Sequence, residues 1–410
     1  MNVQRPESEL MNISKASGRA FQSTSDYIRN PTSKALRQKA RVAARNLLLE
    51  LDDGDDTFFM VQELVTVAHA IFFLMSINAL DPIPTSGSIS AADLAARVNC
   101  STPLITRMMR MLVCSGFFKE TEQDTYAHNR QSLSLVDSGN AALHQVMKDD
   151  IFTKSWPALP EYFSARQMEE PNDPKHHPLG VAIGMDGRDW HEVLARTPAL
   201  MTRIHTAFTG KWSVAPATGL YPFENLVRAS EECAATGRVF MVDVGGAFGD
   251  TQKEIRLAHP ELKGKVITQD QEKVIAIIPA GHLPSELGIE PMSHDFWTPQ
   301  PVKNAKIYYF RRVLHDWPDE YASKILRHQA DVMAEDSVLL VAEMVVPDRV
   351  QREDTWVYQL DLSMFMFSGK ERSAADFAKL FESAGLELVK IWPSADGSTQ
   401  AVIEGRKKRV

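Results

Sequence analysis

The pattern of hydrophobic positions changes near residue 238, and the two sides predict different architectures. Beyond this point, apolar runs of strand length, such as 239–244 (VFMVDV) and 306–310 (KIYYF), alternate with helical patterns over 319–334 and 373–384. The remaining strand-like runs are 265–269, 337–342 and 386–391. Strands that alternate with helices are typical of a parallel sheet covered by helices. We therefore expect an α/β fold with a doubly wound, Rossmann-like sheet.

The N-terminal half predicts helices. Residues 1–45 are polar and end in a helical pattern, which indicates an arm, and 46–81 predict two apolar helices interrupted by the acidic run 52–56. The second helix, from Val61, has apolar positions on nearly every side, which predicts burial all round. Its most apolar stretch, 64–80, is broken by polar residues and falls short of the roughly 20 residues that a membrane span needs. We therefore expect no membrane segment.

A helix–turn–helix pattern followed by two short strands extends over 88–135. Ser90 and Asp93 form a capping box at the first helix, and Pro103 lies in the first turn of the second. This arrangement is typical of a winged-helix domain, which is best known for binding DNA. On the second helix, only two arginines could contact a DNA groove. Its methionines and leucine indicate a face that packs within the protein. We therefore favour dimerisation or covering of a substrate over DNA binding.

Composition limits the classes of function. The chain has 410 residues and a net charge of −8, from 45 Lys and Arg against 53 Asp and Glu. This acidic balance argues against binding nucleic acid through bulk charge. Three cysteines exclude a disulfide scaffold and a CxxC metal site, and the first twenty residues lack the apolar core of a secretion signal. We expect a cytoplasmic protein without a metal site.

A glycine-rich turn at 243–249 (DVGGAFG) follows an apolar strand and predicts a nucleoside site. Such a turn lets a ligand approach the backbone, and an acid at the end of the second strand can accept both ribose hydroxyls. The second strand ends at Asp270, 25 residues after Gly245, and Asp295 with Phe296 follows the third, where an adenine ring could lie. The glycine spacing lacks the dinucleotide order, which favours a nucleoside without pyrophosphate, such as S-adenosylmethionine. The alternative is a purely structural turn with a solvated Asp270.

Six motifs between residues 242 and 385 carry a resemblance to a known family. In chain order they are VDVGGAFGD, QDQEKVI, HDFWTPQPVKNA, RRVLHDWPDE, AEMVVPD and SGKERSAADFAKLFESAG. Together they resemble the S-adenosylmethionine-dependent O-methyltransferases of the plant and fungal small-molecule class, and most of all the fungal enzymes of secondary metabolism. The resemblance covers 221–410 and extends more loosely to the winged-helix region, which serves dimerisation in this family.

The resemblance implies roles for individual residues of these motifs. The residues that it implies for the cofactor are Gly245, Asp270, Asp295, Phe296, Arg311 and Trp317. Gly245 would contact the cofactor through its backbone, and Asp270 would bind the ribose. Asp295 and Phe296 would hold the adenine. The chain departs from the family at Ala247, where a third consecutive glycine is common, and the methyl group there would shift the loop.

The resemblance also implies a catalytic group. His315 matches the family's catalytic base, and Glu343 and Glu371 match the acids that orient it. A phenol has a pKa near 10 and becomes a good nucleophile when a base removes its proton. An imidazole oriented by carboxylates can accept that proton. The acceptor residues implied are Met364, in the position of a D-x-x-M motif, and Asp316.

We expect transfer of the methyl group to a phenolic or enolic hydroxyl of a fungal aromatic or polyketide-type metabolite. The methionines and phenylalanines of 364–367 would give soft contacts to a flat acceptor, or else pack a helix beside the sheet. An alternative is a relative that binds the cofactor but catalyses dehydration or pericyclic ring formation, and a remote one is a winged-helix regulator. Retention of His315 and both glutamates favours methyl transfer.

These inferences divide the chain into four segments. We expect an N-terminal arm over 1–45, a winged-helix dimerisation domain over 46–150, a helical connector and acceptor-pocket lid over 151–220, and the catalytic domain over 221–410. The apolar N-terminal helices, which a monomer would leave exposed, predict a homodimer.

Overall fold

The computed structural model describes residues 5–146, 153–209, 217–395 and 397–408, which fall into two compact units. The first unit contains the described residues of Met1–Trp156 and Leu194–Ser213, and the second those of Pro157–Val193 and Val214–Val410. Two helices, α8 (Thr153–Ser164) and α10 (Trp190–Arg196), cross from one unit to the other. Each unit is described by itself.

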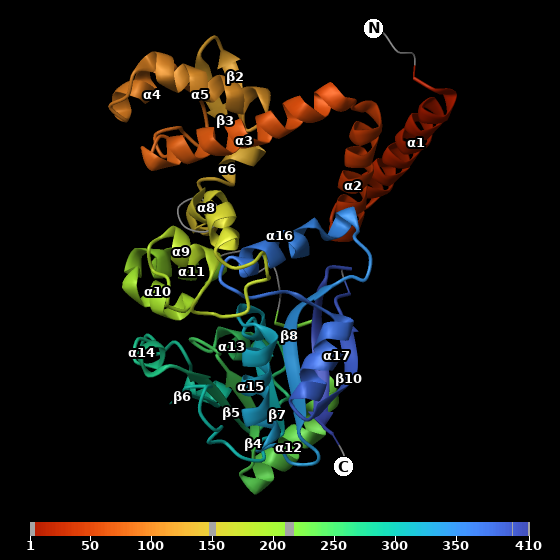
Figure 1. Cartoon of the computed structure of the whole chain (residues 1–410), viewed down its shortest axis with the longest axis vertical. Coiled ribbons are helices and arrows are strands. Elements are labelled where there is room, and N and C mark those ends of the chain that lie inside the picture. The colour runs from red at the N-terminus through yellow and green to blue at the C-terminus, as the bar shows by residue number, and fades with distance from the viewer. Residues whose placement is uncertain (1–4, 147–152, 210–216, 396, 409–410) are drawn as a thin grey trace. The chain divides into compact units, whose positions relative to one another are not determined.

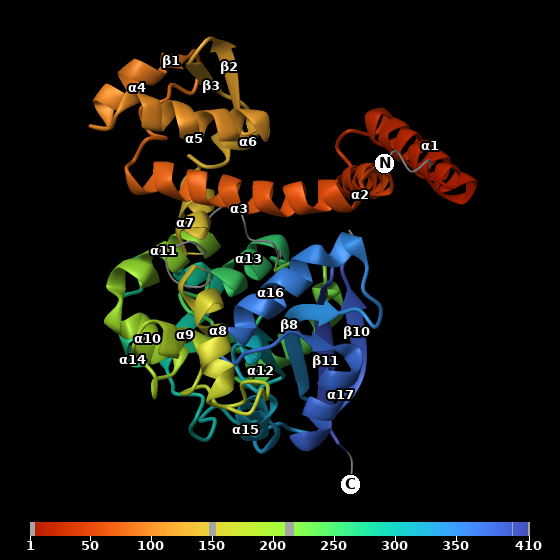
Figure 2. The same ribbon diagram turned by 45° about the horizontal axis from the view of Figure 1, so that its top comes forward.

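Three helices open the first unit: α1 (Glu7–Arg29), α2 (Lys34–Leu51) and α3 (Gly54–Ser76). The first two pack against each other, and α3 is a long single helix (Figure 2). The acidic run separates α2 from α3 because Asp53 caps α3, with its carboxylate accepting hydrogen bonds from the main-chain N–H groups of Asp55 and Asp56. The interruption expected from the sequence is thus a helix N-cap.

The surface of α3 corrects one expectation. In its second half one side is buried, including Ile71 and Leu74, but Phe58, Phe59 and Leu64 are 60%, 67% and 59% exposed, so the helix is not buried all round. The helix spans 23 residues and is therefore longer than expected; by length and composition alone it could cross a membrane, a test that core helices of soluble proteins also pass. Its capped start lies well before Val61, which is why the hydrophobic pattern underestimated the length.

The winged-helix pattern is present. Helices α4 (Ala91–Arg97) and α5 (Thr102–Cys114) pack with a small antiparallel sheet in the order β1 (Ile89–Ser90), β3 (Thr125–His128), β2 (Phe118–Glu122). Ser90 caps α4, with its hydroxyl accepting from the N–H of Asp93 at 3.1 Å. The unit continues with α6 (Arg130–Leu133), α7 (Ser138–Val146) and α11 (Pro198–Thr209).

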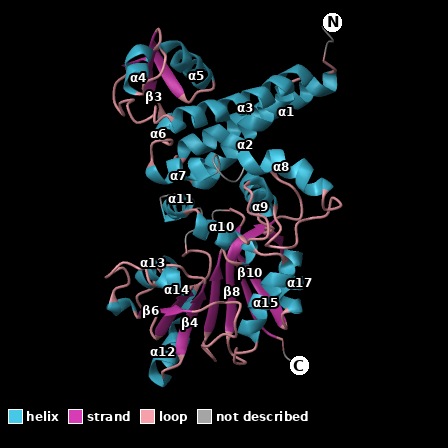
Figure 3. Cartoon of the chain, turned by 60° about the vertical axis from the view of Figure 1, so that its left-hand side comes forward, coloured by secondary structure: helices cyan, strands magenta, loops and turns pink. Residues whose placement is uncertain are grey.

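The second unit is built on an eight-stranded sheet (Figure 3). Its main order is β10 (Leu386–Pro393), β11 (Gln400–Lys407), β8 (Val338–Val346), β7 (Ile307–Arg311), β4 (Val239–Val244), β5 (Lys265–Asp270), β6 (Ile289–Ser293). The short β9 (Arg372–Ser373) pairs with β8 in parallel. The parallel doubly wound core is confirmed, but β11 was not expected. It runs antiparallel to β8 and β10, so the sheet is mixed.

Helices cover both faces of this sheet because the strands alternate their side chains. On β7, Tyr308 and Phe310 pack toward α15 (Asp319–Ala330) and α17 (Ala374–Ser383), which lie against the sheet in Figure 1. The side chains between them pack on the other face with α12 (Val227–Thr236) and α13 (Asp250–Ala258). The other helices of this unit are α9 (Pro178–Ala182), α14 (Glu272–Ile275), α16 (Thr355–Phe365) and short 3₁₀ turns, including Leu314–Asp316.

Candidate active site

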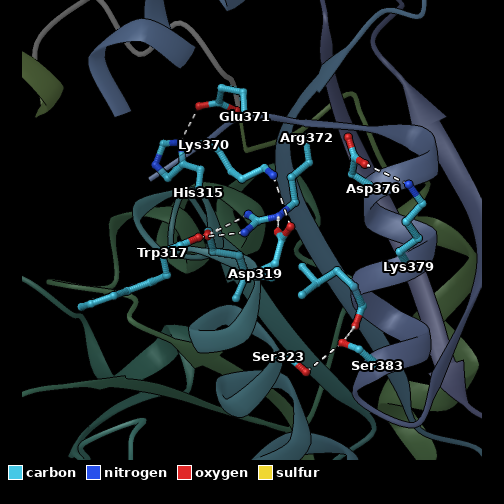
Figure 4. Close-up of polar contacts among 12 residues, drawn as sticks. His315, Trp317, Asp319, Ser323, Lys370, Glu371, Arg372, Asp376, Lys379 and Ser383 are labelled. Carbon is cyan, nitrogen blue, oxygen red and sulfur yellow. Dashed lines mark hydrogen bonds and ion pairs between the residues drawn. The ribbon is translucent and has the colours of Figure 1, made fainter. Parts of the chain in front are cut away.

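His315 lies in the 3₁₀ turn that follows β7, at the carboxyl edge of the parallel strands, where ligands bind in this type of sheet. The imidazole is buried, and both of its nitrogens face carboxylates. Glu371 Oε1 lies 2.7 Å from Nδ1 (Figure 4), and Asp316 Oδ1 lies 3.6 Å from Nε2. The structure thus brings together three of the residues that the sequence singled out.

The carboxylates determine the charge state of the imidazole. Burial alone would lower the pKa of His315, but the negative charges of Glu371 and Asp316 and the hydrogen bond to Glu371 raise it to about 9. The two carboxylates therefore favour the protonated form of the imidazole over the neutral form. Asp316 is itself largely shielded from solvent, which raises its pKa, and the adjacent His315 opposes that rise.

Glu343 acts on the same turn in a different way. Its Oε1 accepts hydrogen bonds from the main-chain N–H groups of Val313, Leu314 and His315, at 3.3, 2.7 and 3.2 Å. The sequence led us to expect Glu343 beyond its strand and against the imidazole. Instead it lies within β8 and holds the main chain that carries the ring.

Arg372 holds the carbonyl side of this turn. Its guanidinium is fully buried and donates to the carbonyl oxygens of Leu314 and Trp317 at 2.9 and 2.7 Å, and to the Asp319 carboxylate at 2.8 Å (Figure 4). A carboxylate on the N–H side and a guanidinium on the C=O side therefore fix the backbone of His315.

The segment that supplies Glu371 is itself fixed. A Cβ at Gly369 would lie 2.3 Å from the carbonyl oxygen of His315, so only glycine fits there. The N–H of Lys370 donates to that same oxygen at 2.8 Å, and the N–H of Glu371 donates to Asp361 of α16 at 2.8 Å. The turn and this segment thus form one rigid arrangement.

Contacts within the protein are sufficient to require the glycines of the turn after β4. A Cβ at Gly245 would lie 2.8 Å from a Val313 methyl group, and one at Gly246 would lie 2.4 Å from Thr268 Oγ1 and 2.5 Å from Asp243 Oδ2. Contacts with the protein's own side chains therefore require both glycines. The expected approach of a ligand is not needed to explain them.

Asp270 and Ala247 are joined in this turn. Ala247 has a left-handed φ of +50°, and its N–H donates to Asp270 Oδ2 at 2.9 Å, while Asp270 Oδ1 accepts from the N–H of Gln271 at 2.8 Å. Burial raises the pKa of Asp270, and these two hydrogen bonds lower it. Each carboxylate oxygen keeps a lone pair that could accept a further hydrogen bond.

Aromatic rings lie beside this edge of the sheet. The buried Trp317 contacts Phe296 and Trp297 edge-to-face, with ring centroids 6.0 and 4.7 Å apart. Asp295 is exposed and accepts from the N–H of Trp297 at 3.1 Å, so it caps its own turn. Arg311, at the end of β7, donates to Thr251 of α13 at 2.9 Å.

Of the acceptor residues implied by the sequence, Asp316 lies in the turn of His315 and Met364 lies on α16, followed by the rest of the segment 364–367. Met364 is buried, and Met366 and Phe367 are buried in protein packing, with Phe367 stacked on Trp190 at 4.7 Å. Phe365 stacks on Phe163 at 5.9 Å. These phenylalanines therefore have partners within the chain, and the alternative of a packed helix beside the sheet describes them better than free contacts to an acceptor.

Comparison with known proteins identifies the family. An O-methyltransferase domain matches residues 187–387, and an O-methyltransferase dimerisation domain matches residues 63–138. The O-methyltransferase hmp5 of Hypomyces subiculosus is 31% identical over 88% of this chain and 90% of its own. The chain belongs to the O-methyltransferase family. Methyltransferase cfoD of Aspergillus candidus, at 31% over 90% of this chain and 91% of its own, agrees.

Solved structures support the same assignment of this O-methyltransferase. OxaC is 26% identical and superimposes over 98% of this chain and all of its own with a TM-score of 0.85. A second OxaC structure, in complex with SAH and oxaline, gives 0.84. A structure described as a pericyclic reaction enzyme, 23% identical over 96% of this chain and 99% of its own with a TM-score of 0.83, shares the fold. The O-methyltransferase depends on S-adenosylmethionine, and the dimerisation domain supports the expected homodimer.

The carboxyl edge of the parallel strands, which we call the cofactor edge, suits a polar nucleoside in this O-methyltransferase. Several buried polar atoms there have no hydrogen-bond partner within the described part of the chain: Asp243 Oδ2, Thr268 Oγ1, His191 Nδ1, His294 Nε2 and Trp317 Nε1. Buried polar groups are normally paired, so atoms of this kind fit a ligand with several donors and acceptors. Burial also raises the pKa of Asp243 to about 7.

Sequence reasoning missed four residues of this site. Asp243 and Arg372 were within the quoted motifs, and a buried acid beside a glycine turn and an arginine beside Glu371 were signals that could have been used. Asp361 was noted only as the start of the D-x-x-M motif. His191 lies in a helical segment without a motif, and nothing in its sequence surroundings marked it.

Proposed function

We propose that this O-methyltransferase methylates a phenolic or enolic hydroxyl of an aromatic or polyketide-type metabolite, with His315 as the general base. The observation that carries the proposal is the buried imidazole held by Glu371 at 2.7 Å on Nδ1, which leaves Nε2 for the proton of the acceptor. S-adenosylmethionine, when bound, supplies the electrophilic methyl group. The residues proposed below act on the acceptor proton and on the position of the two ligands.

Proton transfer is favoured by the matched acidities of the two groups. In its neutral form, which prevails above its pKa of about 9, His315 is a strong enough base to accept a proton from a phenol with a pKa near 10. Glu371 holds Nδ1–H, so the new proton goes to Nε2. The imidazolium that forms is stabilised by Glu371 and Asp316, and Glu343 and Arg372 keep the turn in position.

The cofactor residues remain those of the family motifs. Asp270 would bind the ribose with its free lone pairs, Asp295 and Phe296 would hold the adenine, and Gly245 would border the site through its backbone. Arg311 and Trp317 complete it. Met364 and Asp316 would contact the acceptor.

The organisation of the chain and its location follow the same proposal. Residues 1–45 form the arm, 46–150 the dimerisation domain, 151–220 the connector and lid, and 221–410 the catalytic domain. The connector includes 151–152 and 210–216, which lie outside the described residues. We place the enzyme in the cytoplasm, as a homodimer that acts on a small molecule without nucleic acid.

The test uses methyl-labelled S-adenosylmethionine with a panel of fungal phenols, enols, and polyene or quinone methide precursors. We expect a labelled methyl ether and S-adenosylhomocysteine from the wild type. His315→Ala should lower the rate at least about 100-fold, because general base catalysis contributes factors of that order. Calorimetric binding of S-adenosylhomocysteine by the variant shows that it is folded. Rearrangement or dehydration of a substrate without consumption of the cofactor would instead establish the pericyclase alternative.

A further inference from the structure

His191 lies against the cofactor edge but has no part in the function proposed above. Its ring stacks on Trp317 with centroids 5.3 Å apart and planes 2° from parallel. Trp317 in turn contacts Phe296, which follows β6. His191 thus extends the aromatic cluster that borders the expected adenine position.

The backbone that presents His191 is fixed at several points within the second unit. The Asp189 carboxylate accepts from the N–H of Glu192 at 2.9 Å and so caps α10. His177 accepts the N–H of Gly180 on Nδ1, and its Nε2–H donates to the carbonyl oxygen of Arg188 at 3.1 Å. Trp190 stacks on Phe367. His191 therefore lies in the first turn of a helix that is capped by Asp189 and held in position by the contacts of Arg188 and Trp190.

Two stacked rings here each carry a buried nitrogen without a partner in the part of the chain that the structure describes. They are His191 Nδ1 and Trp317 Nε1. A hydrogen bond to either nitrogen must lie close to the plane of its ring, so parallel stacked rings direct these bonds past the edge of the stack. A buried nitrogen left unpaired costs free energy, and a ligand that supplies a partner removes that cost.

The charges around His191 indicate which ligand this is. Burial raises the pKa values of Asp270 and Asp316, and the nearby imidazole of His191 lowers both. His191 is therefore close to the acid proposed for the ribose and to the acid beside the proposed base. The part of the cofactor that connects the ribose to the reacting methyl group would pass between these two carboxylates.

We propose that His191 is a cofactor-contacting residue, whose Nδ1 forms a hydrogen bond to S-adenosylmethionine and to its product at the edge of the His191–Trp317 stack. The inference rests on the proposed function only for the position of the cofactor. It predicts that the polar nitrogen of His191, rather than its ring, matters for ligand affinity.

The test compares calorimetric dissociation constants for S-adenosylhomocysteine. His191→Phe keeps a ring for stacking and removes the nitrogen, and we expect about tenfold weaker binding, the usual effect of one hydrogen bond. His191→Gln returns a polar group and should recover part of the affinity. His176→Phe is the matched control, because that histidine is half exposed, pairs with Asp186 and should not affect binding.

The melting temperature without ligand separates a binding role from a structural one. Since His191→Phe removes an unpaired buried nitrogen, it should leave the melting temperature unchanged or higher. 5′-Methylthioadenosine, which lacks the amino-acid part, locates the contact. If His191→Phe weakens the binding of both ligands, the contact is to the nucleoside. If it weakens the binding of S-adenosylhomocysteine alone, the contact is to the amino-acid part. Both results support the proposal.

Affinity of His191→Phe within twofold of the wild type would overturn it. If that variant does not fold, nitrogen NMR of the wild type decides, since the His191 Nδ1 resonance must shift on addition of S-adenosylhomocysteine. A resonance that does not shift overturns the proposal. Failure of the proposed function gives a different result, namely a wild-type protein that binds S-adenosylhomocysteine but transfers no methyl group.

Discussion

The turn that carries His315 and the helices α1 to α3 differ in whether their side chains find partners within the chain. Around His315, a buried carboxylate and a buried guanidinium pair with the main chain of the same subunit. In the N-terminal helices, large apolar side chains stay exposed, among them Phe58 and Phe59. The difference indicates that the proposed catalytic group is positioned by one chain, whereas the N-terminal helices are completed by another surface. Four predictions test this comparison.

The largest effect is expected from charges on α3. Phe58→Asp together with Phe59→Asp should convert the dimer to monomers, because each buried apolar side chain contributes about 1.5–3 kcal/mol and each dimer loses four. Acidic residues near the start of the helix are tolerated, so α3 should remain helical. Sedimentation velocity measures the outcome. Leu257→Asp, at an exposed site of α13, is the control, and a dimer that survives the double change would mean that α3 is covered in another way.

Arg372→Met tests whether the buried guanidinium stabilises the turn that carries His315. Removing one partner of a buried charged network costs about 3–5 kcal/mol, because the carbonyl groups of Leu314 and Trp317 lose their donor. Urea unfolding measures the loss. Lys379→Met, which removes an exposed lysine 3.6 Å from Asp376, should change stability by less than about 0.5 kcal/mol. An equal loss in the free energy of unfolding in both variants would show that Arg372 stabilises the protein no more than an exposed lysine does.

Glu371→Gln tests the charge state of the base through the pH profile. A base must be neutral to accept a proton, so kcat/KM of the wild type should rise as the pH passes through about 9, the pKa of His315. Loss of the Glu371 charge should lower that pKa toward 6.5, which moves the rising limb to lower pH and reduces the plateau. Glu320→Gln, at an exposed ion pair, should leave the profile unchanged. A profile of Glu371→Gln that matches the wild type would contradict the assigned origin of the pKa.

The smallest effect is expected at Ala247. A left-handed backbone costs a residue with a Cβ about 1–2 kcal/mol, and glycine loses slightly less than that in chain entropy, so Ala247→Gly should stabilise the protein by up to about 1 kcal/mol. Ala234→Gly on the exposed face of α12 should destabilise it by a similar amount. Thermal unfolding compares the two. Destabilisation by both changes would mean that the turn is not strained at Ala247.

Local sequence determined much of the fold. The strands β4, β5, β7 and β8 and the capped start of α4 were predictable because each depends on neighbouring residues. Strand β11 was missed because polar residues interrupt its pattern, and its place between β8 and β10 depends on partners distant in sequence.

The sequence predicted which residues lie at the site better than it predicted which atoms they contact. The motifs brought His315, Glu371 and Asp316 to one place, yet no motif tells that Glu343 bonds to three main-chain N–H groups. Likewise, a sequence cannot distinguish a glycine required by a ligand from one required by Val313, as at Gly245. His191 went unnoticed because its stacking on Trp317 joins segments more than a hundred residues apart.

The support of His315 by residues that come later in the chain has a consequence during synthesis. Glu371 follows His315 by 56 residues, and β11, which covers the edge of β8, comes later still. On the ribosome, the emerging polypeptide therefore holds a bare strand edge and an unsupported histidine turn until residues near 407 have been released. Such exposed edges invite association, so the interval between translation of β8 and translation of β11 is the one in which the new chain is most exposed to it.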